Sequence, residues 1–266
     1  MNGEEKLKPL QQSNGDETKD KKEDIRVVDN PLDHHYPLWV SLREIAPGTH
    51  KHTQSLMNIV DNVSSAVGCD SDTLKIAAMY HDIGKMWNPM AFTENQSEDN
   101  IHDELDPYLS YQILTRHVSD TVAILVAHNF PIEVIQIASQ HHGKTLNGVY
   151  EKAKKDDKNI NLDDFRYKTE KPASLEALIL MLCDQIEATS RSVYITQQKD
   201  VDPATFVSSV FQKLMMDGQF DEVAIKLGLI STIQRALAGD IASNFQKRVK
   251  YEENDALVEV EAEKER

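Results

Sequence analysis

Cysteine is scarce in this chain, which contains only Cys69 and Cys183 in 266 residues. Two cysteines cannot form a disulfide framework, and both lie in or beside apolar stretches, so we expect free thiols in a reducing compartment. The chain also lacks any run of about 20 apolar residues, and its first residues contain no apolar segment typical of a signal peptide. These absences predict a cytoplasmic protein that neither spans a membrane nor is secreted.

Positive charge is also in the minority. The chain has 29 Lys and Arg against 44 Asp and Glu, which gives a formal net charge of −15. Binding to a nucleic-acid backbone depends on clustered Lys and Arg, so this balance argues against a broad nucleic-acid surface. A small anionic ligand is compatible with the charge, because metals and a few local cations can hold its phosphates. The charge therefore argues against a nucleic-acid partner and leaves a small anionic ligand possible.

Apolar residues are almost absent from residues 1–24, which we expect to be disordered because such a segment cannot offset the entropy of ordering. Residues 252–266 form a short acidic tail. Residues 25–251 are expected to fold as one domain, since 40% hydrophobic content is enough to bury one sizeable core or two small ones. No alternation of period two is sustained anywhere, so the predicted fold is nearly all-α.

Apolar residues recur at intervals of three and four through this domain, which predicts a series of helices. The expected helices cover residues 38–45, 52–67, 74–79, 108–118, 122–127, 131–142 and 174–186, with further helices after residue 203. Gly84 should end the third of these, and Ser174 should cap the last. The chain from 87 to 107 is typical of a loop and that from 145 to 172 of a solvated polar excursion, while 248–251 is expected to be extended.

A neighbouring imidazole and carboxylate, His81 and Asp82, follow an apolar run that ends at Tyr80. Taken alone, a core histidine beside a solvated aspartate explains this pair equally well. Other histidines and one more aspartate accompany similar apolar stretches, and the full set is His52, His81, Asp82, His117, His141, His142 and Asp184. Five imidazoles and two carboxylates suit two divalent transition-metal ions. We therefore predict a di-metal centre in which Asp82 bridges the ions.

Three other histidines compete for these roles. His50 lies close to His52 but off the apolar stripe that directs His52 inward. His128 follows the end of a predicted helix, where a capping or surface role is expected, and it competes with His117. His102 lies in the predicted loop and is expected to make a structural hydrogen bond. We therefore place all three outside the predicted centre.

Several short motifs surround these candidates in order. They are Ala46-Pro47-Gly48-Thr49, Tyr80-His81-Asp82-Ile83-Gly84-Lys85, Phe92-Thr93-Glu94-Asn95-Gln96, Asn100-Ile101-His102-Asp103, Gln140-His141-His142-Gly143, and Asp184 with Glu187-Ala188 and Arg191-Ser192. With them the chain, from about residue 37 to residue 251, resembles the HD-domain phosphohydrolases. It is most similar to the cytosolic domain of the seven-transmembrane HD proteins, the PgpH-type cyclic di-AMP phosphodiesterases. In that family a membrane-spanning helix precedes the domain, whereas here the corresponding segment is charged. We therefore expect a stand-alone relative or the cytosolic part of a membrane protein.

The resemblance implies how the ligands divide between the ions. His52, His81, Asp82 and Asp184 would hold one ion, and Asp82, His117, His141 and His142 would hold the other. Iron or manganese is the implied metal, and Asp82 and Lys85 are the expected catalytic residues, with a solvated turn as the alternative place for Lys85. The implied reaction opens cyclic di-AMP to the linear dinucleotide pApA. A homodimer is compatible with this resemblance.

Base selectivity is expected outside the metal centre, because metals bind the phosphate that every nucleotide carries. The predicted substrate-binding residues are Asn95, Gln96, Tyr167 and Arg191. An aromatic residue and a cation in the segment from Phe165 to Tyr167 can stack on a base, and Arg191 has a surface ion pair with Glu187 as its alternative role. The residues alone support phosphate-ester hydrolysis. Cyclic di-GMP or a nucleoside monophosphate as substrate, and a non-catalytic nucleotide sensor, are therefore the alternatives.

Overall fold

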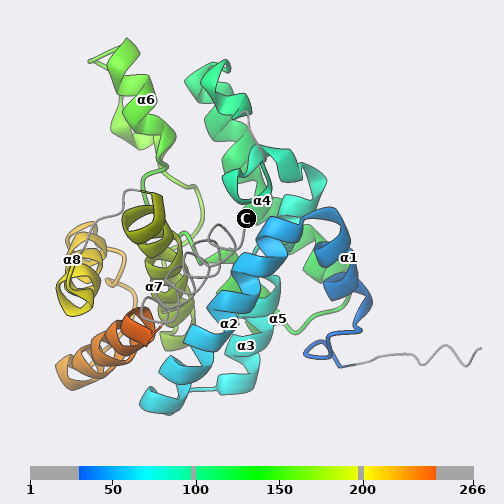
Figure 1. Cartoon of the computed structure of the whole chain (residues 1–266), viewed down its shortest axis with the longest axis vertical. Coiled ribbons are helices and arrows are strands. Elements are labelled where there is room, and N and C mark those ends of the chain that lie inside the picture. Colours follow the sequence, from blue (N-terminus) through cyan, green and yellow to red (C-terminus); the bar gives the residue numbers. More distant parts are fainter. Residues whose placement is uncertain (1–29, 97–99, 197–200, 244–266) are drawn as a thin grey trace, which may run out of the picture.

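The computed structural model describes residues 30–96, 100–196 and 201–243. The features expected at 1–24, 248–251 and 252–266 lie outside the described residues. Within them, every regular element is a helix, and extended pairing is limited to one antiparallel bridge between Leu146 and Arg166. The prediction of an all-α fold is confirmed (Figure 1).

The helices follow one another with short connections. The α-helices of the described chain are α1 (Pro37–Ile45), α2 (Pro47–Val67), α3 (Ser71–Tyr80), α4 (Pro107–Ala127), α5 (Ile132–Ser139), α6 (Val149–Asp156), α7 (Leu175–Ser190) and α8 (Pro203–Met216), followed by a helix over residues 227–243. Short 3-10 helices are η1 (Ile83–Trp87), η2 (Pro89–Ala91), η3 (Thr93–Asn95), η4 (Ile101–Asp103) and η5 (Leu162–Phe165). A π-helical turn, η6 (Arg191–Thr196), continues α7.

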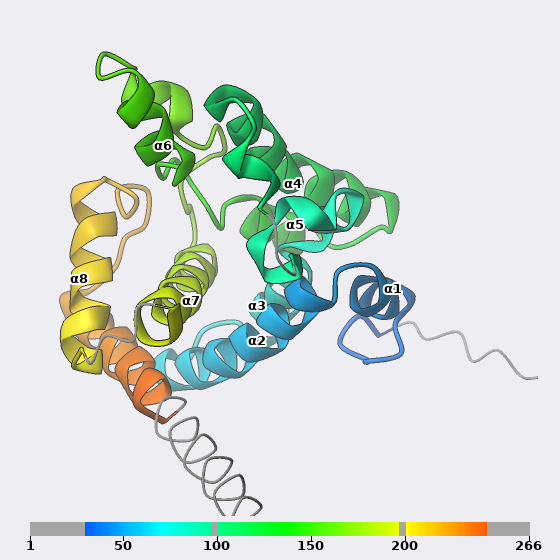
Figure 2. The same ribbon diagram turned by 45° about the horizontal axis from the view of Figure 1, so that its top comes forward.

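The core is built around α7. Its residues from Leu178 to Cys183 have no exposed surface, and a helix that is apolar on all sides must be covered on all sides. It contacts α2, α3, α5 and α8, and Figure 2 shows it between α8 on one side and α2 and α3 on the other. Ser174 caps its first turn by accepting a hydrogen bond from the backbone N–H of Ala177, as predicted. Among the described helices, none has both the length and the apolar character that crossing a membrane requires.

Helix α4 is continuous where the sequence predicted two helices. No proline or glycine interrupts residues 118–122, and Asp120 pairs with Arg116 one turn earlier. The hydroxyl of Thr121 donates to the carbonyl of His81 and accepts from the N–H of Gly84, both at 3.0 Å. These contacts hold the middle of α4 against the segment that follows α3.

The prediction that Gly84 ends the preceding helix is wrong, because α3 already ends at Tyr80 and Gly84 lies in η1. The role of this glycine is close approach. A Cβ at this position would lie 2.2 Å from the carbonyl oxygen of His117 and 2.5 Å from the amide nitrogen of Thr121. The missing side chain therefore lets η1 pack directly on the backbone of α4, which carries His117.

The segment from 145 to 172 is folded and is not simply a solvated excursion. It contains α6, η5 and the bridge between Leu146 and Arg166, and it has a small apolar cluster of its own around Tyr150, Ala153 and Phe165. The ammonium of Lys152 on α6 donates to the carbonyls of His102, Asp103 and Leu105. This cation therefore ties the segment to η4 and to the residues that follow it.

Candidate metal centre

The seven predicted metal ligands converge on one buried site. His52 comes from α2, His117 from α4 and Asp184 from α7, while the His81–Asp82 and His141–His142 pairs follow the ends of α3 and α5. All are buried except His142, which is half-buried. Each pair follows an apolar helix that is anchored in the core, so its short turn holds it at a fixed place.

The donor atoms lie within contact of one another. Nε2 of His52 is 3.0 Å from Oδ1 of Asp184, and Nε2 of His81 is 3.6 Å from the same oxygen. Oδ1 of Asp82 lies 3.3 Å from Nε2 of His117 and 3.7 Å from Nε2 of His141. Asp82 therefore lies among the imidazoles, where a carboxylate can serve more than one ion.

Three overlapping groups have donor atoms that all lie within 4.8 Å of one another. They are His52 with His81 and Asp184, His81 with Asp82 and His141, and His117 with His141 and His142. The group of His81, Asp82 and His141 shares His81 with the first group and His141 with the third. In this respect the arrangement matches two neighbouring ions better than a single ion.

Orphaned polar atoms support the same interpretation. Nε2 of His81, Oδ1 of Asp82 and Nδ1 of His142 are buried and have no hydrogen-bond partner within the described structure. Buried polar atoms are nearly always paired, so such a cluster needs an explanation. Imidazole and carboxylate donors are ligands of divalent transition metals, so these residues fit a di-metal centre.

Three of the imidazoles are oriented by backbone carbonyls. His81, His117 and His141 each place Nδ1 within hydrogen-bond distance of the carbonyl three residues earlier, at 2.8, 2.6 and 2.6 Å. In a neutral imidazole, as in a metal-binding one, donation from Nδ1 leaves the lone pair on Nε2, which faces the centre. His52 is oriented differently, because its Nδ1 contacts Oε2 of Glu187 at 2.7 Å.

Lys85 lies inside the site and not on a solvated turn. Its Nζ is 2.7 Å from Oδ2 of Asp82 and 2.8 Å from Oε1 of Glu94. Burial lowers the pKa of Lys85, but the two carboxylates raise it more, so the ammonium stays charged. For Asp82 burial acts in the opposite direction and raises the pKa. The positive charges of Lys85 and His81 nevertheless hold that pKa well below its ordinary value.

The two sides of the site differ in protonation when no metal is bound. Burial lowers the pKa of His52, but Asp184 and Glu187 raise it to about 9. On the other side, burial and the charge of His81 lower the pKa of His141 to about 3, and burial also lowers the pKa of His142. The imidazoles beside Asp184 are therefore cationic at neutral pH, and those of the doublet are neutral.

Two of the predicted substrate-binding residues, Tyr167 and Arg191, lie beside predicted metal ligands. Tyr167 stacks on His142 with ring centroids 4.1 Å apart, and Arg191 donates to Glu187 beside His52. The side chain of Asn95 accepts from the N–H groups of Gly48 and Thr49 at the start of α2. Its carbonyl oxygen is therefore already engaged, and its position depends on the packing of η3 against α2.

The remaining predicted residues already have partners within the described structure. Gln96 donates to the carbonyl of Met90. Phe165 has no exposed surface and the guanidinium of Arg166 pairs with Asp217, so the suggestion that this segment stacks on a base is restricted to Tyr167. The predicted ion pair of Glu187 with Arg191 forms, but its carboxylate is buried against His52 and does not lie on the helix surface.

The three competing histidines lie outside the groups of donor atoms. His50 packs on Trp39 with ring centroids 4.3 Å apart, and His102 contacts the carbonyl of Ala91 at 2.8 Å, a structural hydrogen bond as expected. His128 is exposed at the end of α4. Sequence reasoning gave no role to Glu94 or to the burial of Glu187. The available signal was that Glu94 follows Lys85 and Glu187 follows Asp184 at short distances in the sequence. This spacing does not show on which face of its element a side chain lies.

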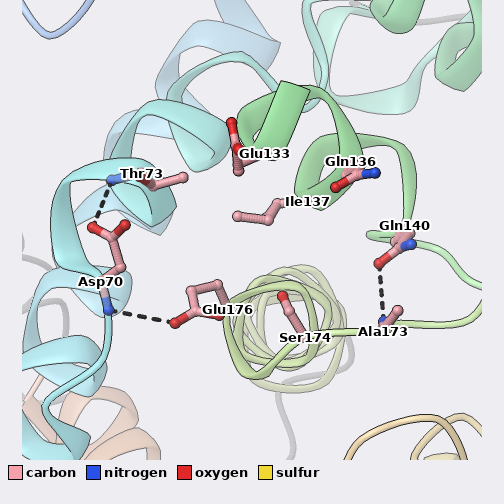
Figure 3. A pocket seen from close by; sticks show the side chains of 9 residues that line it. All are labelled: Asp70, Thr73, Glu133, Gln136, Ile137, Gln140, Ala173, Ser174 and Glu176. Atoms are coloured by element: carbon pink, nitrogen blue, oxygen red, sulfur yellow. Dashed lines mark hydrogen bonds between the residues drawn. The ribbon is translucent and has the colours of Figure 1, made fainter. Parts of the chain in front are cut away.

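Two pockets near these elements differ in their relation to the centre. A pocket of about 240 Å³ is lined by Gly84, Trp87, Phe92 and His117, so it reaches one of the predicted ligands. The pocket in Figure 3 lies between α5 and the first turns of α3 and α7. None of the seven predicted ligands lines the pocket in Figure 3, and its acidic side chains, such as Glu133, argue against an anionic ligand there.

Comparison with known proteins identifies the family. The family model described as the HD domain matches residues 49–189. The chain is 34% identical over 220 residues to the cyclic-di-AMP phosphodiesterase PgpH of Bacillus subtilis and 32% identical over 218 residues to PgpH of Listeria monocytogenes. The aligned regions cover 82% and 81% of this chain but only 31% and 30% of those relatives. The chain therefore matches about a third of the length of these relatives.

A solved structure has the same fold. It is the HD domain of L. monocytogenes PgpH in complex with cyclic-di-AMP, which superposes with a TM-score of 0.73 at 31% sequence identity. The match covers 79% of this chain and 97% of that one. A second crystal structure of the L. monocytogenes PgpH HD domain matches with a TM-score of 0.71. From the family model, the fold and the clustered histidines and aspartates, we conclude that this chain belongs to the HD-domain family.

Proposed function

We propose that this chain is a metal-dependent phosphodiesterase that opens cyclic di-AMP to the linear dinucleotide pApA. The observation that carries the proposal is the set of three overlapping donor groups linked through His81, Asp82 and His141. The proposal is supported by the similarity to PgpH, since a solved domain of that name in complex with cyclic-di-AMP is covered almost completely.

Two divalent transition-metal ions, iron or manganese, are the proposed cofactors. The first would be held by His52, His81, Asp82 and Asp184, and the second by Asp82, His117, His141 and His142. When bound, such ions supply Lewis-acid chemistry, since they polarise phosphoryl oxygens and lower the pKa of water. The chain itself provides the fixed orientation of the imidazoles and excludes bulk water from the buried donors.

Lys85 is the proposed catalytic cation beside Asp82. Its ammonium holds Oδ2 of Asp82, which leaves Oδ1 directed toward His117 and His141. A fixed positive charge at this position favours the negative charge that develops on a phosphoryl group during hydrolysis. Glu94 keeps this ammonium in place from the other side.

Selection of the base is proposed to depend on side chains beside the metals. Tyr167 presents an aromatic ring next to His142, and the guanidinium of Arg191 lies beside His52. Gln96 is partly exposed, and because its Nε2 donates to the carbonyl of Met90, its Oε1 is the atom that it can offer to a base edge. Asn95 is proposed to act indirectly, because its amide already binds Gly48 and Thr49.

The proposal is tested by incubating the purified, metal-loaded chain with cyclic di-AMP, cyclic di-GMP and adenosine monophosphate, and identifying the products by chromatography. We expect cyclic di-AMP to be converted to pApA and to be preferred over cyclic di-GMP. Phosphate release from the mononucleotide alone would indicate a nucleotide monophosphatase. Binding of cyclic di-AMP without any product would indicate a sensor and would contradict the proposed function.

A further inference from the structure

We propose that Asp217 and Gln219, in the turn after α8, are positioning residues that hold His142 in place for the second metal ion. The inference rests on the di-metal part of the proposed function. These residues lie 75 to 78 positions after the His141–His142 doublet, and none of the hydrogen bonds described for their side chains reaches a predicted ligand. They act on the backbone that follows it.

Hydrogen bonds form a closed ring around the peptide groups of Lys144. Oε1 of Gln219 accepts from the backbone N–H of Lys144 at 3.0 Å, and Nε2 of Gln219 donates to Oδ2 of Asp217 at 2.9 Å. The carboxylate of Asp217 accepts hydrogen bonds from both terminal nitrogens of Arg166, at 3.1 and 2.7 Å. Arg166 closes the ring by donating to the carbonyl of Lys144 at 2.7 Å. Every donor and acceptor in the ring is thereby matched.

The ring is tightly packed against the turn that carries the doublet. Gln219 is 1% exposed, and a Cβ on Gly143 would lie 2.4 Å from its Oε1 atom and 2.7 Å from Cε of Met181. Gly143 also has a φ of 52°, which favours glycine. The hydroxyl of Thr169 donates to the carbonyl of Gly143. The backbone immediately after His142 is therefore held from both sides.

His142 depends on this support more than the other imidazoles do. His81, His117 and His141 each have Nδ1 anchored on a backbone carbonyl, whereas Nδ1 of His142 has no hydrogen-bond partner within the described chain. Its ring is instead stacked on Tyr167, at an interplanar angle of 23°.

The ring of hydrogen bonds also fixes this stacking partner. Tyr167 directly follows Arg166, and its backbone N–H donates to the carbonyl of Thr145 at 3.0 Å. Thr145 in turn donates its hydroxyl and its N–H to the carbonyl of His142, at 2.8 and 3.1 Å. The side chains of Asp217 and Gln219 thus hold both segments that pair in the bridge between Leu146 and Arg166. His142 lies shortly before one of these segments and Tyr167 lies in the other, and their two rings stack on each other.

The test is a titration of the metal-free chain with Co²⁺, followed by cobalt absorption and by elemental analysis. The wild type should bind two ions. In Gln219→Ala, Gln219→Glu and Asp217→Asn the first ion should bind as in the wild type and the second about tenfold or more weakly, as expected when an outer partner of a ligand is lost. Gln219→Glu opposes two carboxylates, and Asp217→Asn removes the charge that Arg166 requires.

The double variant Asp217→Asn, Gln219→Glu provides a rescue. It restores one donor and one acceptor between the two positions, keeps an acceptor for the N–H of Lys144, and preserves the net charge. It should bind the second ion more tightly than Gln219→Glu does, since the amide introduced at position 217 can donate to the carboxylate introduced at position 219, although it leaves Arg166 a single acceptor. A loss of folding cannot produce this pattern, and thermal unfolding in chelator monitors the fold of each variant.

The matched control is Asp221→Asn. Asp221 lies in the same turn and pairs with Lys171 at 2.9 Å, but this pair does not reach the peptide of Lys144. The Asp221→Asn variant should bind both ions as the wild type does. Unchanged binding of two ions in all three single variants would overturn the positioning role alone, and so would a double variant that binds the second ion no more tightly than Gln219→Glu. A wild type that binds fewer than two ions would overturn the di-metal proposal and the positioning role with it.

Discussion

Glu187 and His52 are 135 residues apart in the sequence, yet Oε2 of Glu187 lies 2.7 Å from Nδ1 of His52. Both side chains are buried, and Nε2 of the same imidazole faces Asp184. A carboxylate behind a metal-binding histidine fixes its orientation and raises its basicity. Glu187 is therefore suited to hold His52 toward the first proposed ion.

Removal of this carboxylate should weaken the first ion. We expect Glu187→Ala to lower its affinity about 10–100-fold, because outer partners of metal ligands have effects of this size. Glu187→Gln should have a smaller effect, since an amide oxygen still accepts from Nδ1. Metal titration with a competing chelator provides the measurement. Glu176→Gln, on the first turn of the same helix, is the control, and equal affinities in Glu187→Ala and the control would contradict the role.

Replacement of Lys85 should destabilise the metal-free protein. Lys85→Met leaves two carboxylates, Asp82 and Glu94, without their shared cation, and breaking a buried ion pair costs about 3–5 kcal/mol. Urea denaturation in chelator measures the change in the free energy of unfolding. The matched control is Lys75→Met, which breaks the more exposed pair with Asp61 and should cost less than about 1 kcal/mol. Similar losses in the two variants would show that Lys85 has no special structural role.

Asp82 should be essential for turnover but dispensable for the helical fold. We expect Asp82→Ala to reduce hydrolysis of cyclic di-AMP below about a tenth of the wild-type rate, because both proposed ions share this carboxylate. The circular-dichroism spectrum should stay helical, since the apolar residues of α2, α3 and α7 supply the core. Asp61→Ala is the control for a surface carboxylate. Activity above this level in Asp82→Ala would place the reaction elsewhere.

The metal-free protein should lose stability as the pH rises above neutrality. The folded-state pKa of His52 is about 9, above the ordinary value of 6.5, so its protonated form is favoured by folding. This contribution is fully present below pH 6.5 and is lost as the pH rises through about 9. Unfolding free energies measured in chelator between pH 6.5 and 9.5 should therefore fall. The decrease should be smaller in His52→Gln, and equal slopes in the two proteins would contradict this origin.

Much of this protein can be predicted from local sequence patterns. The all-α fold, the cap at Ser174 and the inward stripe that carries His52 follow from apolar spacing and cap chemistry, which depend only on neighbours along the chain. The break predicted near Asp120 failed because polarity alone does not end a helix. Only the packed structure places Thr121 between His81 and Gly84 and holds α4 continuous.

The sequence by itself selected the residue types of the candidate centre, because histidines and aspartates beside buried apolar helices need a partner for their polar atoms. Tertiary structure decided which of those atoms share a site and what holds them. Glu187 contacts His52, Lys85 contacts Glu94, and Gln219 contacts Lys144. Each contact joins different elements, and the sequence alone does not show that their side chains face each other. Such contacts depend on the packing of α2, α7 and the turn after α8 in three dimensions, which no local pattern specifies.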